Sequence, residues 1–463
     1  MKRISYKTYV FFGSIVIFLL SVLGIKDLVF FQMSIVLSVY LFIFIHLYRQ
    51  KAQILDFGVI LAAMGSLYIL GPTIAVIFGK IEKDEYYEHS QLILYSILCL
   101  CFFYLGYRYK LINRKICKAN NTHKKTLGFI QKHNHSIIKI ALIVVLVVFI
   151  LSQFLIISGV GLSSYFTIGR AATKLVITTK YAKLSMFTGL GNFVNTFALI
   201  LFLEERKRKK FDYVYFSIFI VSGVMAILLA IISMDRSTLL LIILPFIYVL
   251  HFYKIINTKM VIASGIAMVF LFVIWKGSLS RFLKTGSIGI TKRDISIPTE
   301  IYIWFEVGSN IIDALKNEEI NYYCGYTYLR AFESIINPLF QNYDSLSTWY
   351  MKTFETALYL KGSGRAFSCI VESYLNFNIL GSVLVFFPMG IFYKTIEAKT
   401  YTSIYWRCYY ALSLAYIYKI FRSEAYSIVK MSFWTWGVPL LIIYFFDCKY
   451  KSTHKQKVIG KLS

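Results

Sequence analysis

The sequence predicts an all-α polytopic membrane protein with about twelve transmembrane helices and one large outer loop between the ninth and the tenth. Hydrophobic residues make up 58% of the 463 residues, against roughly 45–50% in soluble domains. Charged residues make up only 16%. The apolar residues form runs of about 16 to 22, long enough to cross a bilayer as a helix. These observations exclude a soluble enzyme, a disordered chain and a disulfide-stabilised scaffold.

The apolar runs, taken in order, give the expected spans. Only Lys26 and Asp27 separate the first two, which predicts a tight helical hairpin. The ninth run is short, and the eleventh contains Arg407. The predicted spans are residues 10–25, 28–47, 57–78, 92–107, 140–157, 186–203, 213–234, 237–253, 260–275, 371–393, 402–420 and 427–446.

The basic residues predict the orientation of these spans. The formal net charge is +27, but Lys and Arg cluster between apolar runs, which argues against a nucleic-acid partner. Nine of them and no acid fall between Arg108 and Lys139, and five consecutive basic residues form 206–210. Because positively charged loops stay in the cytoplasm, we expect both termini to be cytoplasmic.

This topology divides the chain into four parts. We expect nine spans in residues 1–275, a large periplasmic loop at 276–370, three spans in 371–446 and a basic cytoplasmic tail at 447–463. Apolar residues recur at helical spacing in two stretches of the loop, which predicts helices lying on the outer face of the bundle. Four aromatic side chains of these stretches could contact a ligand or pack on the bundle: Tyr302, Trp304, Trp349 and Tyr350.

Arginine stands close to a carboxylate at three outer helix junctions. Asp235-Arg236 separates the seventh and eighth spans, Arg365 and Glu372 flank the start of the tenth, and Arg422-Ser423-Glu424 separates the last two. The planar guanidinium offers two parallel donors and stays charged, which suits a diphosphate. The candidate contacts for such an anion are Arg236, Arg365 and Arg422, followed by Arg170 and Arg330.

Motifs for a bound cofactor are absent from the sequence. It contains neither a phosphate-binding Gly-x-x-x-x-Gly-Lys-Ser/Thr nor His-Glu-x-x-His. Of the seven histidines, only His89 is expected on the outer side. The acidic cluster that precedes it is typical of a solvated loop. We therefore expect no metal and no cofactor.

One segment after the large loop resembles the O-antigen polymerase family, the Wzy-type oligosaccharide repeat-unit polymerases. The residues Gly362-Ser363-Gly364-Arg365 are followed by Glu372-Ser373-Tyr374-Leu375-Asn376-Phe377 and Gly381. Glu372, Tyr374, Asn376, Phe377 and Gly381 match the family pattern, whereas Asn378 stands where glycine is usual. Three further segments look similar to the family: Gly325-Tyr326-Thr327-Tyr328-Leu329, Asn337-Pro338 and Asp235-Arg236-Ser237. The matching residues cover about a tenth of the chain, and the architecture is similar throughout.

The resemblance implies a GT-C-like, metal-independent glycosyltransferase in the bacterial inner membrane. Such an enzyme polymerises undecaprenyl-diphosphate-linked repeat units on the outer face, passing the growing glycan en bloc to the non-reducing end of a new repeat. Glu372 is the first candidate for the general base, with Asp235 and Glu424 as alternatives, and Tyr374 and Asn376 would contact substrate. On this resemblance the candidate arginines would contact the diphosphate or an anionic sugar, and the four aromatic side chains of the loop could stack on sugar rings. The implied partners are polyprenyl-diphosphate-linked oligosaccharides and membrane lipids, with a chain-length regulator and a flippase as further ones.

Two other functions fit parts of this pattern. A lipid-linked oligosaccharide flippase would also have about twelve spans, but it should show two related halves and short outer loops. An O-antigen ligase would share the chemistry and differ in its acceptor. That family is expected to use a histidine in its large loop, and His89 is the only histidine expected on the outer side of this chain.

Overall fold

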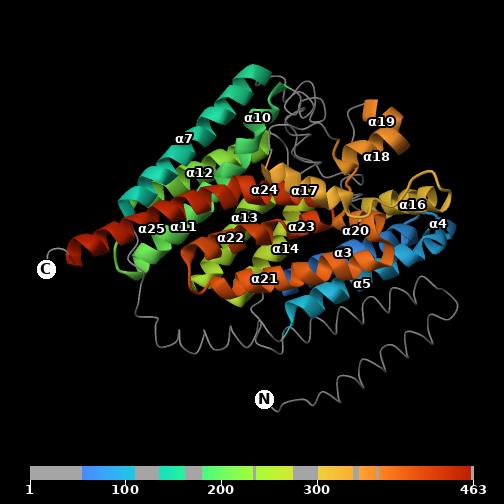
Figure 1. Ribbon diagram of the computed structural model, residues 1–463, viewed down its shortest axis with the longest axis horizontal. Helices are drawn as coiled ribbons and strands as arrows, with labels where there is room; N and C mark the ends of the chain where they lie inside the picture. Colours follow the sequence, from blue (N-terminus) through green and yellow to red (C-terminus); the bar gives the residue numbers. More distant parts are fainter. Residues whose placement is uncertain are drawn as a thin grey trace, which may run out of the picture.

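The computed structural model describes residues 55–109, 135–161, 180–232, 236–274, 301–336, 344–360 and 364–459. All regular elements in these ranges are helices, and no strand occurs among them (Figure 1). The predicted spans 10–25 and 28–47 lie outside the described residues. So do most of the segment that follows the fifth span and the first part of the predicted large loop, residues 276–300.

Six helices are long and apolar enough to cross a membrane, and a bent pair would make seven. The six are Phe57–Ile77, Ser90–Tyr107, His135–Val160, Phe187–Lys207, Tyr213–Ile232 and Ala425–Cys448. They coincide with six predicted spans. The full set of twelve is not confirmed within the described part of the chain.

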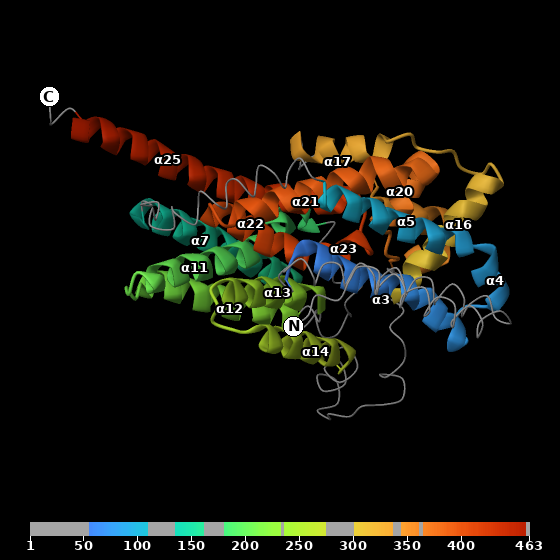
Figure 2. The same cartoon turned by 90° about the horizontal axis from the view of Figure 1, so that it is seen from below.

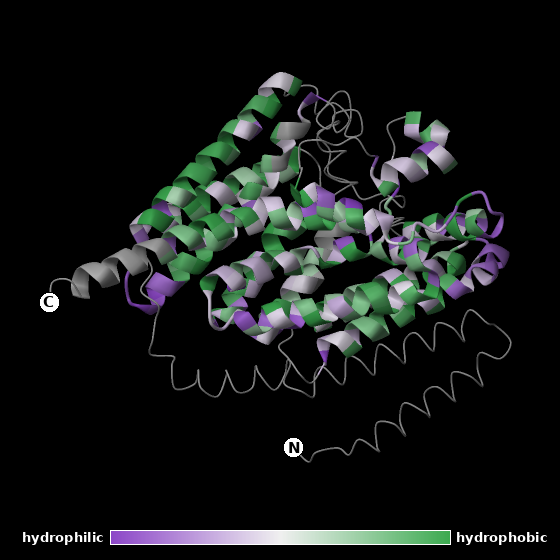
Figure 3. Ribbon diagram, in the orientation of Figure 1, coloured by the Kyte–Doolittle hydropathy of each residue, from purple (hydrophilic) through white to green (hydrophobic). Residues whose placement is uncertain are grey.

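The helices of the first half are α3 (Phe57–Ile77), α4 (Lys83–Glu88), α5 (Ser90–Tyr107), α7 (His135–Val160), α10 (Ala182–Ser185), η1 (Met186–Gly189), α11 (Leu190–Lys207), α12 (Tyr213–Ile232), α13 (Arg236–Phe252) and α14 (Thr258–Ile274). The predicted eighth and ninth spans correspond to α13 and α14, each 17 residues long. Hydrophobic residues cover the long helices, and hydrophilic ones gather at helix ends and connections (Figure 3).

The second half consists of shorter helices. They are α16 (Ile303–Lys316), α17 (Tyr326–Ile336), α18 (Leu346–Phe354), α19 (Thr356–Leu360), α20 (Cys369–Phe377), η4 (Asn378–Leu380), η5 (Ser382–Phe386), α21 (Phe387–Lys399), α22 (Ile404–Ala415), α23 (Ile417–Ile420), α24 (Ala425–Met431), η6 (Ser432–Gly437) and α25 (Val438–Ile459). In two perpendicular views, α4 and α16 lie together at one end of the molecule, and the C-terminal end of α25 lies at the other (Figure 2).

The predicted span 371–393 is not one continuous helix, because the chain bends by 119° between Cys369–Leu380 and Ser382–Lys399. Two residues produce the bend. Asn378 has a φ of +52°. A Cβ atom on Gly381 would lie 2.2 Å from the carbonyl oxygen of Ser373, so only glycine permits this approach. Hydropathy alone cannot reveal the bend, because both arms are apolar.

Asn378 occupies the family position where glycine is usual, and its positive φ explains that preference. A residue with a Cβ is strained in this backbone region, and asparagine tolerates it better than most. Its amide donates to the hydroxyl of Tyr322 at 3.0 Å, and its side-chain oxygen accepts from the backbone N–H of Ile379 at 2.8 Å. Asparagine therefore substitutes for glycine by supplying its own hydrogen bonds.

We expect Asn378→Ala to lower the unfolding free energy by about 1–2 kcal/mol, because alanine keeps the strain and loses both hydrogen bonds. Asn378→Gly should be close to neutral, because relief of strain offsets the lost hydrogen bonds. Thermal unfolding of the two purified variants in one detergent tests this. Equal destabilisation by alanine and glycine would show that the side-chain hydrogen bonds, and not the backbone conformation, decide the effect.

The predicted eleventh span is also interrupted, since α22 and α23 contain twelve and four residues. Its Arg407 is 6% exposed and pairs with Glu204 at the end of α11. The guanidinium also donates to the hydroxyl of Tyr253 and to the carbonyl oxygen of Thr400 at 3.2 Å. A buried arginine with these partners is satisfied internally, which explains how an apolar segment holds this charge.

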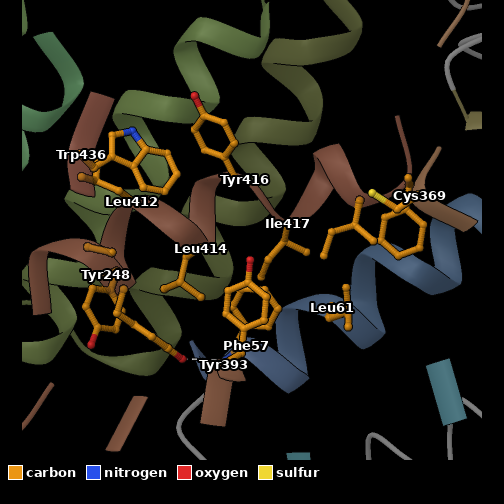
Figure 4. Close-up of a cluster of buried hydrophobic side chains, with 14 of the residues drawn as sticks. Phe57, Leu61, Tyr248, Cys369, Tyr393, Leu412, Leu414, Tyr416, Ile417 and Trp436 are labelled. Carbon is orange, nitrogen blue, oxygen red and sulfur yellow. Dashed lines mark hydrogen bonds between the residues drawn. The ribbon is translucent and has the colours of Figure 1, made fainter. Parts of the chain in front are cut away.

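One cluster of the buried core lies where α3, α13, α20, α21, α22, α23 and η6 meet (Figure 4). Aromatic side chains dominate it. The ring of Phe57 stacks on that of Tyr393, and the rings of Tyr416 and Trp436 meet edge to face with centroids 4.4 Å apart. This packing fixes α23, so that the short segment after it reaches α20 in a defined position.

Candidate functional site

Glu372 of α20 joins three separate segments through its buried carboxylate. The side chain has no exposed surface. One oxygen accepts from the hydroxyl of Thr327 on α17 at 2.7 Å, and the other accepts from the backbone N–H of Ala425, the first residue of α24, at 2.6 Å. A carboxylate held in this way fixes the relative positions of α17, α20 and α24.

Asn376, one turn further along α20, completes this arrangement. Its amide nitrogen donates to Thr327 Oγ1 at 2.7 Å and to the carbonyl oxygen of Glu372 at 2.8 Å. Its side-chain oxygen accepts from the N–H of Gly325 at 3.0 Å. Gly325 has a φ of +90°, which glycine adopts without strain. We call Gly325, Thr327, Glu372, Asn376 and Ala425 the clasp.

The clasp brings together two of the segments that resemble the polymerase family. Residues 325–329 and 372–377 are also joined by the stacked rings of Tyr328 and Phe377, with centroids 5.9 Å apart. The N–H of Tyr323 donates to the carbonyl oxygen of Leu375 at 3.1 Å. The loosely matching positions of the sequence thus contact one another directly.

Arg365, just before α20, lies between two carboxylates. Its Nε is 2.9 and 2.8 Å from the two oxygens of Glu355, at the end of α18. Its Nη1 is 3.2 Å from Glu306 on α16. All three side chains are partly exposed, at 27% for Arg365, 16% for Glu355 and 29% for Glu306. Burial raises the pKa of Glu306, and the charge of Arg365 opposes the shift.

Arg422 and Glu424 lie in the segment between α23 and α24. Arg422 is partly exposed, and within the described residues its guanidinium makes no hydrogen bond or ion pair. Glu424 is 3% exposed. Its oxygens accept from the N–H of Ser347 at 3.1 Å and from the hydroxyl of Ser427 at 3.1 Å. Among the described residues, the segment therefore presents a cation without a hydrogen bond or ion pair next to a buried carboxylate.

This segment packs on the start of α20. The thiol of Cys369 donates to the carbonyl oxygen of Ser423 at 3.1 Å, next to the contact between Glu372 and Ala425. Ser347 of α18 also donates to the carbonyl oxygen of Arg365, so α18 bridges the segments of Arg365 and Glu424. The structure thus connects four predicted site residues, Arg365, Glu372, Arg422 and Glu424, through adjoining segments.

Burial raises the pKa of Glu424, which makes stability depend on pH. The folded state holds the proton more tightly than the unfolded chain, so the unfolding free energy falls as the pH rises from the ordinary carboxyl pKa to the raised one. Glu424→Gln removes this titration. Between the ordinary carboxyl pKa and the raised one, we expect the midpoint temperature of Glu424→Gln to fall less than that of the wild type. Parallel pH profiles of the two proteins would contradict this expectation.

The other predicted site residues have different surroundings. Arg330 donates to the hydroxyl of Tyr326 at 2.7 Å and lies over its ring. Tyr374 is partly exposed, and its ring meets that of Tyr95 edge to face. Arg236 is the first residue of α13, and its side chain lies outside the described part. Arg170 and Asp235 also lie outside the described residues.

Three of the four aromatic residues for which the sequence left sugar stacking and packing on the bundle open are core residues. Tyr302, Trp304 and Tyr350 are 6%, 1% and 0% exposed. The indole N–H of Trp304 donates to the carbonyl oxygen of Tyr68 at 2.9 Å. Trp349 is partly exposed and packs edge to face on Phe354 and Tyr323. Three of these four aromatic side chains therefore pack on the bundle.

The sequence analysis missed three charged residues of this region. Glu306 and Glu355 form ion pairs with Arg365. Both lie on or beside the predicted amphipathic stretches, and the only sequence feature that could have identified them is an acidic residue close to the start of a helix. Lys430 lies within the predicted last span, and its Nζ is 3.5 Å from the hydroxyl of Tyr426 one turn earlier. A lysine inside an apolar run is itself a signal of function.

One group in the described part of the chain has ligands suited to a metal. Glu88, His89 and Asp313 each offer one atom, and these atoms lie within 4.8 Å of one another. His89 Nε2 is already 2.9 Å from both oxygens of Asp313, and its Nδ1 is 3.0 Å from the carbonyl oxygen of Glu85. These contacts satisfy the imidazole and join α4 to α16 without an ion.

Comparison with known proteins identifies the family. A sequence model of the O-antigen polysaccharide polymerase Wzy family matches residues 6–453. No curated protein and no solved structure matches the chain significantly. The match spans the predicted spans, the large loop and the clasp. The chain therefore belongs to the O-antigen polysaccharide polymerase Wzy family, whose members are multi-pass membrane enzymes of the glycosyltransferase type that polymerise lipid-linked repeat units of surface polysaccharides.

Proposed function

We propose that this protein joins undecaprenyl-diphosphate-linked oligosaccharide repeat units into an O-antigen or a related surface polysaccharide. The growing glycan leaves its lipid diphosphate and passes en bloc to the non-reducing end of a new lipid-linked repeat. The observation that carries this proposal is the family match over residues 6–453. It favours a polymerase over a flippase or a ligase.

The leaving diphosphate requires positive charge rather than a proton donor. Fixed cations that meet the developing charge lower the barrier without reorganising. Our first candidate for the contact with the diphosphate is Arg422, whose guanidinium makes no hydrogen bond or ion pair within the described residues. Arg365 is the second, because Glu306 and Glu355 fix its orientation. Arg236, Arg330 and Arg170 are further contacts on this proposal, and no metal takes part.

The acceptor hydroxyl must lose a proton to a carboxylate. Glu372 and Glu424 are buried, and each of their oxygens accepts a hydrogen bond, so we propose that they position α17, α18 and α24 rather than accept the proton in this state. Glu306 is partly exposed and has a raised pKa, both of which suit a general base. Asp235 is the alternative base. Tyr374 would contact the sugar, and Asn376 would hold the turn at Gly325 in place.

We place the protein in the bacterial inner membrane, with both termini in the cytoplasm. On this orientation the tail 447–463 is cytoplasmic, and the segments that carry Arg365 and Arg422 face the periplasm. Basic residues at 206–210 support this side assignment. A flippase would supply the lipid-linked repeats, and a chain-length regulator would act on the product.

The gel profile of the host's surface polysaccharide after deletion of the gene tests the proposal. We expect the ladder to collapse to a band that carries a single repeat, and complementation with the wild-type gene to restore it. Loss of every band that carries a repeat would contradict the proposal. It would mean that repeats fail to reach the outer face or the final acceptor, as for a flippase or a ligase.

A further inference from the structure

The amphipathic helix α17 turns its apolar side outward. Thr327, Ala331 and Ser334, all small, face the bundle and are 6%, 2% and 4% exposed. Leu329, Phe332 and Ile336 are 62%, 65% and 85% exposed. Three large apolar side chains on one uncovered strip of a helix mark a surface that contacts something other than water. We call Leu329, Phe332 and Ile336 the apolar strip.

The contacts of α17 show how deep it lies along the last candidate span. At one end, Glu372 links Thr327 to Ala425, the first residue of the span Ala425–Cys448. At the other end, the indole N–H of Trp434 donates to the carbonyl oxygen of Ser334 at 3.1 Å. The two helices therefore run side by side in the same direction, as Figure 1 shows.

Trp434 stands nine residues after Ala425, which corresponds to about 13 Å along a helix. Ser334 lies at this level, and Ile336 follows it in the same direction. If Ala425–Cys448 crosses the membrane, the apolar strip lies below the level at which that span begins. Hydrocarbon is then the environment that the strip meets.

A polar edge borders the apolar strip on α17. Tyr326, Arg330 and Glu333 share this edge at helical spacing, and Arg330 donates to the hydroxyl of Tyr326 at 2.7 Å. A helix with one apolar strip and one polar edge that carries an arginine and a tyrosine suits the boundary between hydrocarbon and head groups. The small residues on its third side permit close packing against α24.

We propose that α17 is a membrane-embedded arm of the large loop, whose apolar strip contacts the bilayer hydrocarbon of the leaflet in which Ala425–Cys448 begins. The loop predicted at 276–370 is then not wholly outside the membrane. This arm connects the bilayer directly to the clasp, because Gly325 and Thr327 belong to the turn and first residues of α17. The inference does not depend on the reaction that the protein catalyses.

Photocrosslinking in vesicles tests this inference on the full chain. Phe332→benzoylphenylalanine places a photoreactive aromatic group on the apolar strip, and Glu319→benzoylphenylalanine places it on an exposed connection after α16. Both proteins are reconstituted in vesicles of phosphatidylethanolamine and phosphatidylglycerol. After irradiation, we expect mass spectrometry to find phospholipid adducts at position 332 in several-fold excess over position 319.

Two results would overturn the inference. Equal adduct yields at the two positions would mean that the apolar strip lies in water. A crosslinked dimer at position 332 in place of lipid adducts would mean that a second copy of the chain covers it. Ile336→benzoylphenylalanine repeats the test at the most exposed residue of the strip, so a folding defect in one variant does not leave the question open.

Discussion

Glu372→Ala should abolish polymer formation and lower the unfolding free energy by roughly 2–5 kcal/mol. Truncation leaves the hydroxyl of Thr327 and the N–H of Ala425 buried without their acceptor. It also opens a cavity where α17, α20 and α24 meet. The unfolding temperature in detergent and the length of the polymer in complemented cells measure the two effects.

Glu372→Gln separates the two roles of this residue. Glutamine can accept from the N–H of Ala425 and donate to Thr327 Oγ1, so it preserves most of the clasp. We expect stable protein and substantial polymer from this variant, because on our proposal Glu372 positions the site. Stable protein with no polymer would instead make Glu372 the general base, the role that the family resemblance first suggested.

Arg422→Ala should reduce polymer yield by about two orders of magnitude, the usual cost of removing one group that stabilises transition-state charge. Stability should be unchanged, because the guanidinium makes no hydrogen bond or ion pair within the described residues. Arg422→Lys keeps the charge and loses the planar fork, so we expect an intermediate yield. The ladder profile, together with the midpoint temperature of each purified protein, provides the measurement.

Arg365→Ala is the matched comparison for Arg422→Ala. Removal of Arg365 leaves Glu306 and Glu355 side by side without their cation, so this variant should lose stability as well as polymer. Wild-type polymer from Arg422→Ala, at normal protein levels, would remove Arg422 from the mechanism. The pair therefore distinguishes a cation that binds substrate from one that holds the fold.

Hydropathy predicts the long helices of this protein well, because crossing a bilayer requires a continuous apolar run. Helices α3, α5, α7 and α12 begin and end within a few residues of the predicted spans, apart from the polar turn at the start of α7. The same reasoning fails at 371–393, where Asn378 and Gly381 bend an apolar segment. Local backbone conformation decides that case, and average hydropathy does not record it.

The sequence pointed to four residues that the structure connects, but not to their contacts. The pattern of an arginine near a carboxylate at an outer helix junction predicted Arg365, Glu372, Arg422 and Glu424 as site residues. The partners of these residues come from segments far away in sequence, such as Glu306 for Arg365 and Thr327 for Glu372. No periodicity or charge pattern links such positions, so the burial of Glu372 and Glu424 could be recognised only in the folded structure.

The clasp has a consequence for the order in which the protein becomes active during its synthesis. Its groups come from residues 325, 327, 372, 376 and 425, and the helices that carry them have only seven to eleven residues, too few to persist alone. A nascent chain that has inserted its earlier spans still lacks the N–H of Ala425. The clasp therefore forms only when translation has reached the last candidate span, and a chain truncated before that point would reach the membrane without it.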